Sequence, residues 1–487
     1  MKRPQVHLNL HSLYFTEIKR IFIPLLLSIF IACQSSEDKK LEEVLNLSGS
    51  NRQELETVLH HYTQNPEDSL KLKAARFLII NMPGHCSYTG NCIREYYEEA
   101  YKIIFSDLEI NKKVEKLNEL SEDYSVDTFE TTEDYSIITA KYLIENIDKA
   151  FYDWQYGDWA KGISFDEFCE YMLPYKCVEY QELDNWREVL APIANEAISD
   201  YQYNDIWTKS PYWAAEAINI KLKDIIIMDI KKTLKSHSLY KEPFWGKIPS
   251  KSCDTRTNTA LAIMRSKGFP VTKDFILHWA TNFNSHSWLN VLIDHNKGLP
   301  CEGGHEAFLA CVRPGECKGK IYRMTYTANP EIIELKKESK EIPISFQNEF
   351  MKDVTEEYVS AINISMSILS DKKKSKEKYA YLTIFGNNKW TPVCFCKIKN
   401  KRELIFKKIE KGAIYMPAYY KHGKFEPINY PALLNEKGML EYLIPDTNNL
   451  CSISLSRKYP LVRKAFTTAQ RLKGSMLQAA NKSDFTG

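Results

Sequence analysis

The chain has 487 residues, of which 44% are hydrophobic and 12% aromatic, and these values favour a globular protein of about two to four domains. Its 65 basic and 63 acidic side chains leave a formal net charge of only +2. No overall field draws such a chain to nucleic acid or to an acidic surface, so we expect no nucleic-acid partner.

The N-terminal segment carries an export pattern. Lys19 and Arg20 precede the apolar run IFIPLLLSIFIA, which ends at Ala32 and is followed by Cys33. A membrane span needs about 20 apolar residues, whereas a signal-peptide core needs about 7 to 15. The ending FIAC resembles a bacterial lipoprotein signal, so residues 1–32 are predicted to be a signal peptide and Cys33 the lipidation site. The mature chain would be anchored to a membrane by its lipid and face the periplasm or the cell surface. A plain secretory peptide and a buried amphipathic helix are the alternatives.

Helical periodicity dominates residues 33–245. In NPEDSLKLKAARFLIINMPG, Asn65 is placed to cap a helix that ends before the Pro-Gly pair. In ISFDEFCEYMLPY, Ser164 and Glu167 form a capping-box pattern, and Pro174 ends the helix. This part of the chain is therefore predicted to be a helical region.

The pattern changes twice after the helical region. Residues 246–340 combine one helix with short apolar runs such as DFILHWA and SWLNVLI, which is typical of a small α+β unit. Residues 341–466 contain several strand-like segments, with a hairpin turn predicted at 386–388, and their spacing favours a β-sandwich. The basic run at 371–378 is predicted to be a solvated loop. Residues 467–487 form a C-terminal stub that resembles the opening of a further β-module.

Cys253 begins a predicted helix. In SCDTRTNTALAIMRSKGFPV, Ser252 is placed to cap a helix that runs to Lys267, and Gly268 takes the C-terminal cap position. Unpaired backbone N–H groups and the positive end of the helix dipole would lower the pKa of a thiol in the first turn. A free cysteine is also a common inert core residue, so placement alone leaves both roles open.

His286 opens a predicted strand that follows this helix. Alternation places His286, Trp288 and Asn290 on one face of the strand. A histidine near a helix-start cysteine is what thiol catalysis needs, because it accepts the thiol proton and later protonates the leaving group.

A third group should orient the imidazole, and the sequence offers Asp294, Glu302 and Glu306. Asp294 lies about 26 Å along an extended strand from His286, which makes it a poor candidate. A hairpin symmetric about Asn296 would place Glu306, not Glu302, opposite His286. Spacing therefore does not favour Glu302, although the turn is long enough to allow an offset.

The two motifs together resemble the core of the transglutaminase-like superfamily, in which a helix-start cysteine precedes an H-x-W strand and an acid on the next strand. The resemblance carries the acid position onto Glu302 in PCE. It implies a papain-like α+β core with Cys253 as nucleophile, His286 as base and Glu302 as orienting acid. Two departures matter: the acid is Glu where the family usually has Asp, and Asp254 follows the nucleophile where transglutaminases proper tend to have Trp. The missing aromatic puts glutamine–lysine crosslinking in doubt.

The flanking segments LKLKAARFLIINMPGH, ISFDEFCEYMLPYK and RKYPLVRKAF resemble a wider group of bacterial lipoproteins with this core between a helical region and a β-rich region. The expected fold class is therefore multidomain α+β, with a helical N-terminal region, a transglutaminase-like core and a C-terminal β-sandwich. The resemblance implies acyl transfer from an amide without metal or other cofactor, and hydrolysis of a peptide or amide bond is favoured because no amine site is visible. Backbone N–H groups at the helix start would stabilise the oxyanion. The alternative is a non-catalytic surface lipoprotein that binds glycan or peptide through its β-sandwich.

Other polar and aromatic candidates weigh less. Cys301, His305, Cys311 and Cys317 match no compact zinc pattern, so disulfide or core roles are favoured over metal binding. The aromatic segment at 152–159 could stack on a sugar or peptide, but a buried helix end is the preferred interpretation.

Two smaller questions remain open at this point. His278 and Trp279 could line the cleft of the core or belong to a strand core. Eleven cysteines follow Cys33, an odd number that hints at one free thiol, and the spacings 86–92 and 311–317 could close small disulfide loops.

Overall fold

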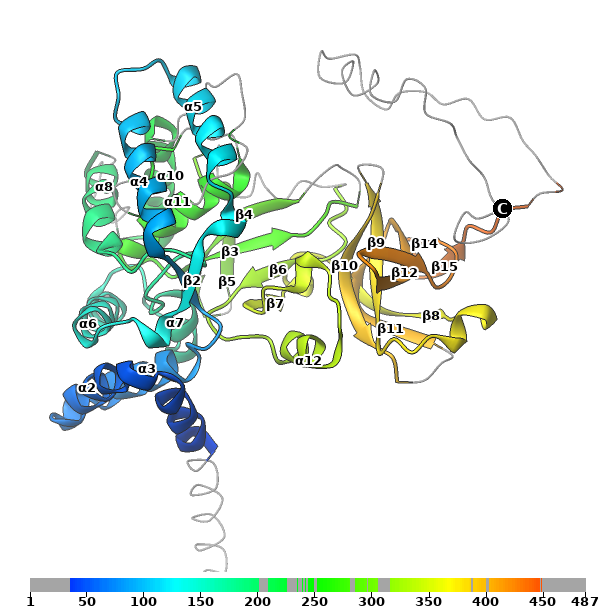
Figure 1. The fold of residues 1–487 in the computed structure, drawn as a ribbon, viewed down its shortest axis with the longest axis horizontal. Coiled ribbons are helices and arrows are strands. Elements are labelled where there is room, and N and C mark those ends of the chain that lie inside the picture. The colour runs from blue at the N-terminus through cyan, green and yellow to red at the C-terminus, as the bar shows by residue number, and fades with distance from the viewer. Residues whose placement is uncertain are drawn as a thin grey trace, which may run out of the picture. The chain divides into compact units, whose positions relative to one another are not determined.

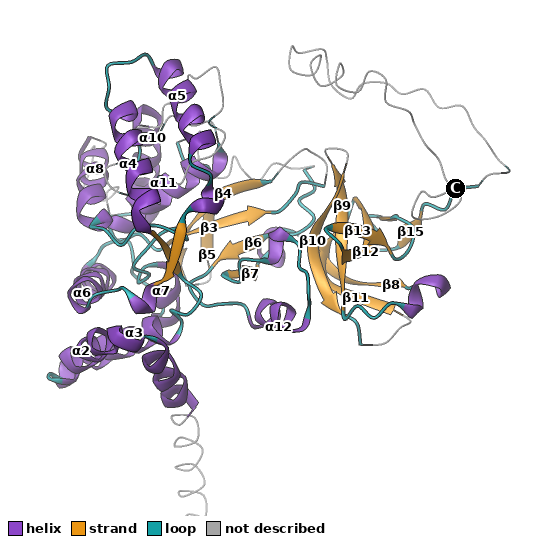
Figure 2. Cartoon of the chain, in the orientation of Figure 1, coloured by secondary structure: helices purple, strands orange, loops and turns teal. Residues whose placement is uncertain are grey.

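The computed structural model describes residues 36–200, 209–225, 234, 239, 241, 244–248, 252–280, 285–295, 297–304, 316–386, 389–399, 403–446 and 448. The predicted signal peptide with Cys33, the predicted stub at 467–487, and His305, Glu306 and Cys311 lie outside these residues. The described chain is mixed α+β, with a helical N-terminal region and several antiparallel sheets (Figures 1 and 2). It forms two compact units: unit 1 comprises residues 1–251, 262–270 and 292–297, and unit 2 comprises residues 252–261, 271–291 and 298–487.

Unit 1 is built mainly of helices. They are α2 (Arg52–Thr63), α3 (Ser69–Ile80), α4 (Gly90–Ile104), α5 (Ile110–Asp123), α6 (Ala140–Tyr156), α7 (Phe165–Tyr171), α8 (Trp186–Asp200) and α10 (Pro211–Ile225). Two short strands, β1 (Cys86–Thr89) and β2 (Glu130–Glu133), pair antiparallel. The helices bury one apolar face each, as their periodicity predicts.

Local capping fixes two helix starts in unit 1. Asn65 Oδ1 accepts the Glu67 N–H at 3.1 Å and caps a 3₁₀ turn that leads into α3. Ser164 Oγ accepts the Glu167 N–H at 3.3 Å, while Glu167 Oε2 accepts the Ser164 N–H at 2.9 Å. The predicted capping box is confirmed, and α7 ends before Pro174.

Unit 2 contains the predicted catalytic motifs. Helix α11 (Cys253–Ser266) begins in this unit. A five-stranded sheet has the order β5-β4-β3-β6-β7, formed by β3 (Val271–Ile276), β4 (His286–Asp294), β5 (Lys297–Cys301), β6 (Tyr322–Met324) and β7 (Met351–Asp353). Strands β3 and β4 are antiparallel, with Ile276 opposite His286 and Lys273 opposite Leu289. Helices α12 (Pro330–Glu338) and α13 (Thr355–Tyr358) complete this part.

The C-terminal part of unit 2 is built of strands. They are β8 (Ala361–Ser367), β9 (Tyr379–Gly386), β10 (Lys389–Lys397), β11 (Glu403–Glu410), β12 (Ala413–Lys421), β13 (Lys424–Pro427), β14 (Ala432–Leu434) and β15 (Leu440–Tyr442). One sheet has the order β10-β9-β12-β14-β15, with β13 on β12, and β11 pairs with β8 in a second sheet. Strands β9 and β10 form an antiparallel hairpin at the predicted turn, with Gly386 opposite Lys389.

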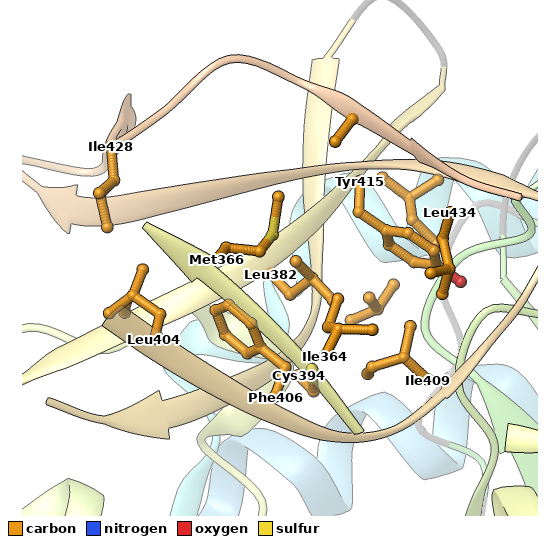
Figure 3. Packing of buried hydrophobic residues seen from close by; sticks show 14 of the residues in the cluster. Ile364, Met366, Leu382, Cys394, Leu404, Phe406, Ile409, Tyr415, Ile428 and Leu434 are labelled. Carbon is orange, nitrogen blue, oxygen red and sulfur yellow. The ribbon is translucent and has the colours of Figure 1, made fainter. Parts of the chain in front are cut away.

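One hydrophobic core lies between these two sheets (Figure 3). Met366 from β8 and Phe406 from β11 are fully buried beside Leu382 from β9 and Tyr415 from β12. Alternation along the strands directs these side chains inward, and burial of such large apolar groups contributes about 1.5–3 kcal/mol each.

Candidate active site

Helix α11 begins where the capping pattern predicts. The Ser252 carbonyl accepts the Arg256 N–H at 3.2 Å, so Cys253 lies in the first turn and its thiol is half-buried. The helix ends at Ser266, and Gly268 adopts the left-handed conformation (φ 85°) predicted for its cap. Thr257 Oγ1 donates to the Ser287 carbonyl at 3.2 Å and holds the helix start against β4.

Glu302 is the acid that contacts His286. Its Oε1 lies 3.0 Å from His286 Nε2, and both side chains are largely buried. Glu302 directly follows β5, which pairs with β4. The resemblance, rather than the simple hairpin geometry, therefore picked the acid that the structure brings to the imidazole.

The hairpin is offset from symmetry about Asn296, as the length of the turn allowed. A Cβ atom on Gly298 would lie 2.0 Å from Asn290 Oδ1, so residue 298 approaches residue 290 just as Glu302 approaches His286. In each of these two pairs the residues are equally distant from Asp294 along the chain, so the hairpin is centred on Asp294. Since Gly298 alone leaves room for the Asn290 side chain, the offset register has a steric cause.

Of the other two acids, Asp294 is described by the structure and lies away from the imidazole. Asp294 lies at the opposite end of β4 from His286, and its Oδ1 accepts the His295 N–H at 2.8 Å. Glu306 lies outside the described residues.

Cys253 and His286 are hydrogen-bonded through their side chains. Burial acts to raise the pKa of the Cys253 thiol, but hydrogen bonds from His286 and Ser287 outweigh it, and the pKa lies below its ordinary value. Burial likewise opposes the charged imidazole, yet the bonds to Cys253 and Glu302 raise the pKa of His286 to about 9. Because Nε2 bonds Glu302, Nδ1 is the nitrogen left for the thiol.

A close backbone approach positions Glu302. A Cβ atom on Gly303 would lie 2.8 Å from the Arg256 carbonyl oxygen and 2.9 Å from Ala260 Cβ, so only glycine fits where the chain passes α11. Arg256 Nη2 lies 3.9 Å from Glu302 Oε2. Sequence reasoning missed both groups, although the Gly-Gly pair after PCE is a signal for such an approach.

Aromatic side chains enclose the imidazole. The Trp279 ring stacks on His286 with centroids 5.7 Å apart, and the Trp288 ring lies 5.8 Å from it. Lys318, which is almost fully buried, places its Nζ 5.2 Å from the Trp279 ring centre. Trp279 thus belongs to the surroundings of His286, whereas His278 is buried and its Nδ1 contacts the Trp279 carbonyl oxygen at 2.6 Å.

A buried network of hydrogen bonds holds the Trp288 side chain. Trp288 Nε1 donates to the Tyr358 hydroxyl at 3.0 Å, and that hydroxyl donates to Asp274 Oδ2 at 2.6 Å. Arg323 grips both oxygens of Asp274 at 2.8 Å. The Arg323 guanidinium bonds both carboxylate oxygens, which explains why the charge of Asp274 is tolerated inside this sheet.

The remaining sequence candidates fall outside this site. The nine described cysteines are all free thiols, so the suggested Cys86–Cys92 loop and the idea of a single free thiol are wrong. Cys301 and Cys317 are buried, and the described residues hold no group of three potential metal ligands. Tyr152 and Tyr156 are 62% and 75% exposed, so the segment 152–159 is not a wholly buried helix end.

Unit 1 contains a separate cavity of about 580 Å³. Its lining comprises aromatic rings, three cations and one acid: Tyr97, Tyr101, Phe244, Arg94, Lys102, Lys241 and Glu98. Lys241 Nζ lies 5.6 Å from the Tyr97 ring centre, and the exposed Tyr101 ring contacts the Phe105 ring in a tilted arrangement with centroids 4.5 Å apart. This mixture of flat apolar and charged groups suits a polar organic ligand.

Comparisons with protein-family models, with curated proteins and with solved structures found no match to this chain. Among the described residues, no helix is long and apolar enough to cross a membrane. The geometry of the site is therefore the main evidence on function.

Proposed function

We propose that this protein is a cysteine-dependent acyl-transfer enzyme of the transglutaminase-like type, and that it hydrolyses a peptide or amide bond. The observation that carries the proposal is the hydrogen-bonded chain Cys253–His286–Glu302. A nucleophile, a base that contacts it and a third group that orients the base form the arrangement on which thiol catalysis depends.

The proposed reaction has two halves. The Cys253 thiolate attacks the amide carbonyl carbon, the C–N bond breaks, and the His286 imidazolium gives its proton to the departing amine. Water then attacks the resulting thioester while neutral His286 accepts its proton. The carboxylic acid leaves, and the thiolate–imidazolium pair is restored.

Two groups stabilise the charges that develop during the proposed reaction. The Glu302 carboxylate stabilises the imidazolium and fixes the tautomer of His286. The backbone N–H groups at the start of α11 are the proposed donors to the oxyanion, because the positive end of the helix dipole favours negative charge there. The substrate is proposed to be a peptide or protein, with water as the acceptor of the acyl group.

The proposal includes the wider architecture. We assign the part of unit 2 from α11 to β7 as a transglutaminase-like, papain-like core and the strands β8 to β15 as a β-sandwich, so the expected boundary at residue 340 moves beyond β7, which pairs with β6. The order of helix, histidine strand and acid strand supports the first assignment, and the core shared by two sheets supports the second. Lipid attachment at Cys33 and an extracytoplasmic location rest on the sequence pattern.

The test uses the full chain and a panel of peptides that carry a thiol-reactive acyloxymethyl ketone. We expect covalent labelling of Cys253, hydrolysis of the matching peptide amides, and loss of both in Cys253→Ala. Cys92→Ala is the matched control, because Cys92 is also a half-buried free thiol but lies in unit 1, whereas Cys253 lies in unit 2. Equal labelling of wild type and Cys253→Ala, with activity retained, would reject the proposal.

A non-catalytic binding function is supported by one observation, the aromatic and charged cavity of unit 1, although the alternative expected from the sequence placed binding on the β-sandwich and not there. In that case the chain would bind a glycan or peptide there and use the core as a scaffold. Calorimetric titration with oligosaccharides and peptides tests this possibility. Binding that Tyr101→Ala removes, in a chain whose Cys253 is inert, would favour this alternative over the enzyme.

A further inference from the structure

An ion pair lies beside the proposed nucleophile and is not explained by the proposed reaction. Asp254 directly follows Cys253 in the first turn of α11, and Lys273 lies on β3. Lys273 Nζ donates to Asp254 Oδ1 and, at 3.0 Å, to Asn258 Oδ1. Asn258 Nδ2 in turn donates to Asp254 Oδ2 at 3.3 Å, so the pair is held from two sides.

The pair is connected to the thiol through Ser287. Ser287 Oγ donates to Asp254 Oδ1 at 3.4 Å, and its carbonyl oxygen accepts the Thr257 hydroxyl. The Ser287 backbone also hydrogen-bonds the Cys253 sulfur, while the single Ser287 hydroxyl proton is shared between the sulfur and Asp254. Three residues of α11 therefore hydrogen-bond Ser287. His286 immediately precedes Ser287 on β4.

The charges around Cys253 make the sign of the Asp254 carboxylate important. A carboxylate one residue from a thiolate disfavours the thiolate, because like charges repel. Among the described residues, the charged groups that ion pairs connect here are Asp254 and Arg256 on α11, Lys273 on β3, His286 on β4 and Glu302 after β5. Lys273 is the cation that bonds Asp254 directly and balances its charge.

We propose that Asp254 and Lys273 form a positioning pair, which holds Ser287 against the Cys253 sulfur and cancels the negative charge that would otherwise oppose the thiolate. This inference rests on the proposed role of Cys253 as nucleophile. Neither residue needs to touch the substrate. The pair acts through Ser287 and through the local field.

The experiment measures the pH midpoint of Cys253 alkylation by iodoacetamide in the full chain, followed by peptide mass spectrometry. Lys273→Met leaves the Asp254 carboxylate unbalanced, so the midpoint should rise by about one pH unit, with about tenfold slower alkylation below it. Asp254→Asn removes the repelling charge and leaves Lys273, so the midpoint should fall. The double variant should return close to the wild-type midpoint.

Opposite shifts of the alkylation midpoint in the two single variants distinguish this electrostatic role from a purely structural role of the pair. A loss of packing would move both single variants in the same direction, and that result, or no shift in either, would overturn the proposal. Lys421→Met is the matched control, because Lys421 forms a similar pair with Glu426 at 3.0 Å between β12 and β13. It should leave the Cys253 midpoint unchanged.

Asp254→Asn keeps the test decisive if Lys273→Met fails to fold, because the substitution preserves shape at a half-exposed side chain. A fall of its midpoint sustains the proposal, and an unchanged or raised midpoint refutes it. No substrate is needed for this measurement. Absence of hydrolysis in the wild type would therefore count against the proposed function and not against the role of the pair.

Discussion

Glu302 bonds one nitrogen of His286 and leaves the other nitrogen for the Cys253 thiol. This arrangement favours proton transfer from sulfur to imidazole, since the carboxylate stabilises the imidazolium while His286 and Ser287 stabilise the thiolate. The two groups titrate as a coupled pair, and the charged form is populated between the two pKa values. The pH dependence of the site follows from these two pKa values.

The pH profile of hydrolysis should differ from that of alkylation. The pKa of Cys253 is lowered from its ordinary value and that of His286 is raised to about 9, so the thiolate and the imidazolium coexist in a pH range that ends near 9. Hydrolysis should rise as the thiol ionises and decline above about pH 9, when His286 loses the proton that the departing amine needs. Alkylation needs only the thiolate and should not decline there. Hydrolysis that continues to increase above pH 9 would contradict the assignment of His286.

Glu302→Gln preserves size but removes the charge that stabilises the imidazolium. The pKa of His286 should fall, because the Glu302 carboxylate is one of the groups that raise it. We expect kcat to drop by about 10²-fold and the decline at high pH to begin at lower pH. Glu302→Asp retains the charge on a shorter arm and should recover part of the activity. Wild-type kcat in Glu302→Gln would exclude an orienting role for this acid.

At the level of elements, the site depends on how β3, β4 and β5 are aligned and on what supports them. Two glycines set the path of the acid strand: Gly298 admits the Asn290 side chain, and Gly303 passes close to α11. The buried ion pair of Asp274 and Arg323 connects β3 to β6 and belongs to the same hydrogen-bond network as Trp288. Breaking a buried pair is costly, because it leaves an uncompensated charge.

Asp274→Asn should therefore destabilise the chain strongly. Both partners of the pair are almost fully buried, so we expect the free energy of unfolding to fall by about 3 kcal/mol. Chemical denaturation measures this change. Glu357→Gln is the control: Glu357 also contacts Arg323, at 2.7 Å, but it is 46% exposed, and its loss should cost less than about 1 kcal/mol. Equal effects of the two substitutions would show that burial of Asp274 is not the cause.

Local patterns predicted the elements better than their alignment. The capping box at Ser164, the start of α11 at Cys253 and the cap at Gly268 are specified by neighbouring residues, and the structure confirms them. The register of the β4–β5 hairpin depends on contacts between strands, so counting about Asn296 could not select Glu302, the acid that the structure brings to His286. Lys273 and Ser287 were missed because an ion pair between a helix and a sheet leaves no periodic signal in either segment.

For the whole molecule, the predicted order of a helical region, an α+β part and a strand-rich part agrees with the order of elements. The two compact units do not divide at a linker, because unit 1 includes the end of α11 and the end of β4. Sequence composition marks changes of secondary structure, but it does not show which segments pack together. Attachment to a membrane remains a prediction from the N-terminal pattern.

Cys33→Ser tests that prediction. In a bacterial host that processes lipoproteins, the wild-type chain should fractionate with membranes and carry a lipid detectable by mass spectrometry. The variant should lack the lipid and shift to the soluble fraction. An unmodified Cys33 in the wild type, or identical fractionation of both chains, would contradict lipid anchoring.

The central claim is that His286 activates Cys253 as a nucleophile. The most direct measurement is the rate of alkylation of each free cysteine in the full chain at pH 7, resolved peptide by peptide. We predict that Cys253 reacts at least about tenfold faster than Cys92 and that His286→Ala removes this advantage. Reaction of Cys253 at the rate of Cys92, or an unchanged rate in His286→Ala, would contradict the claim.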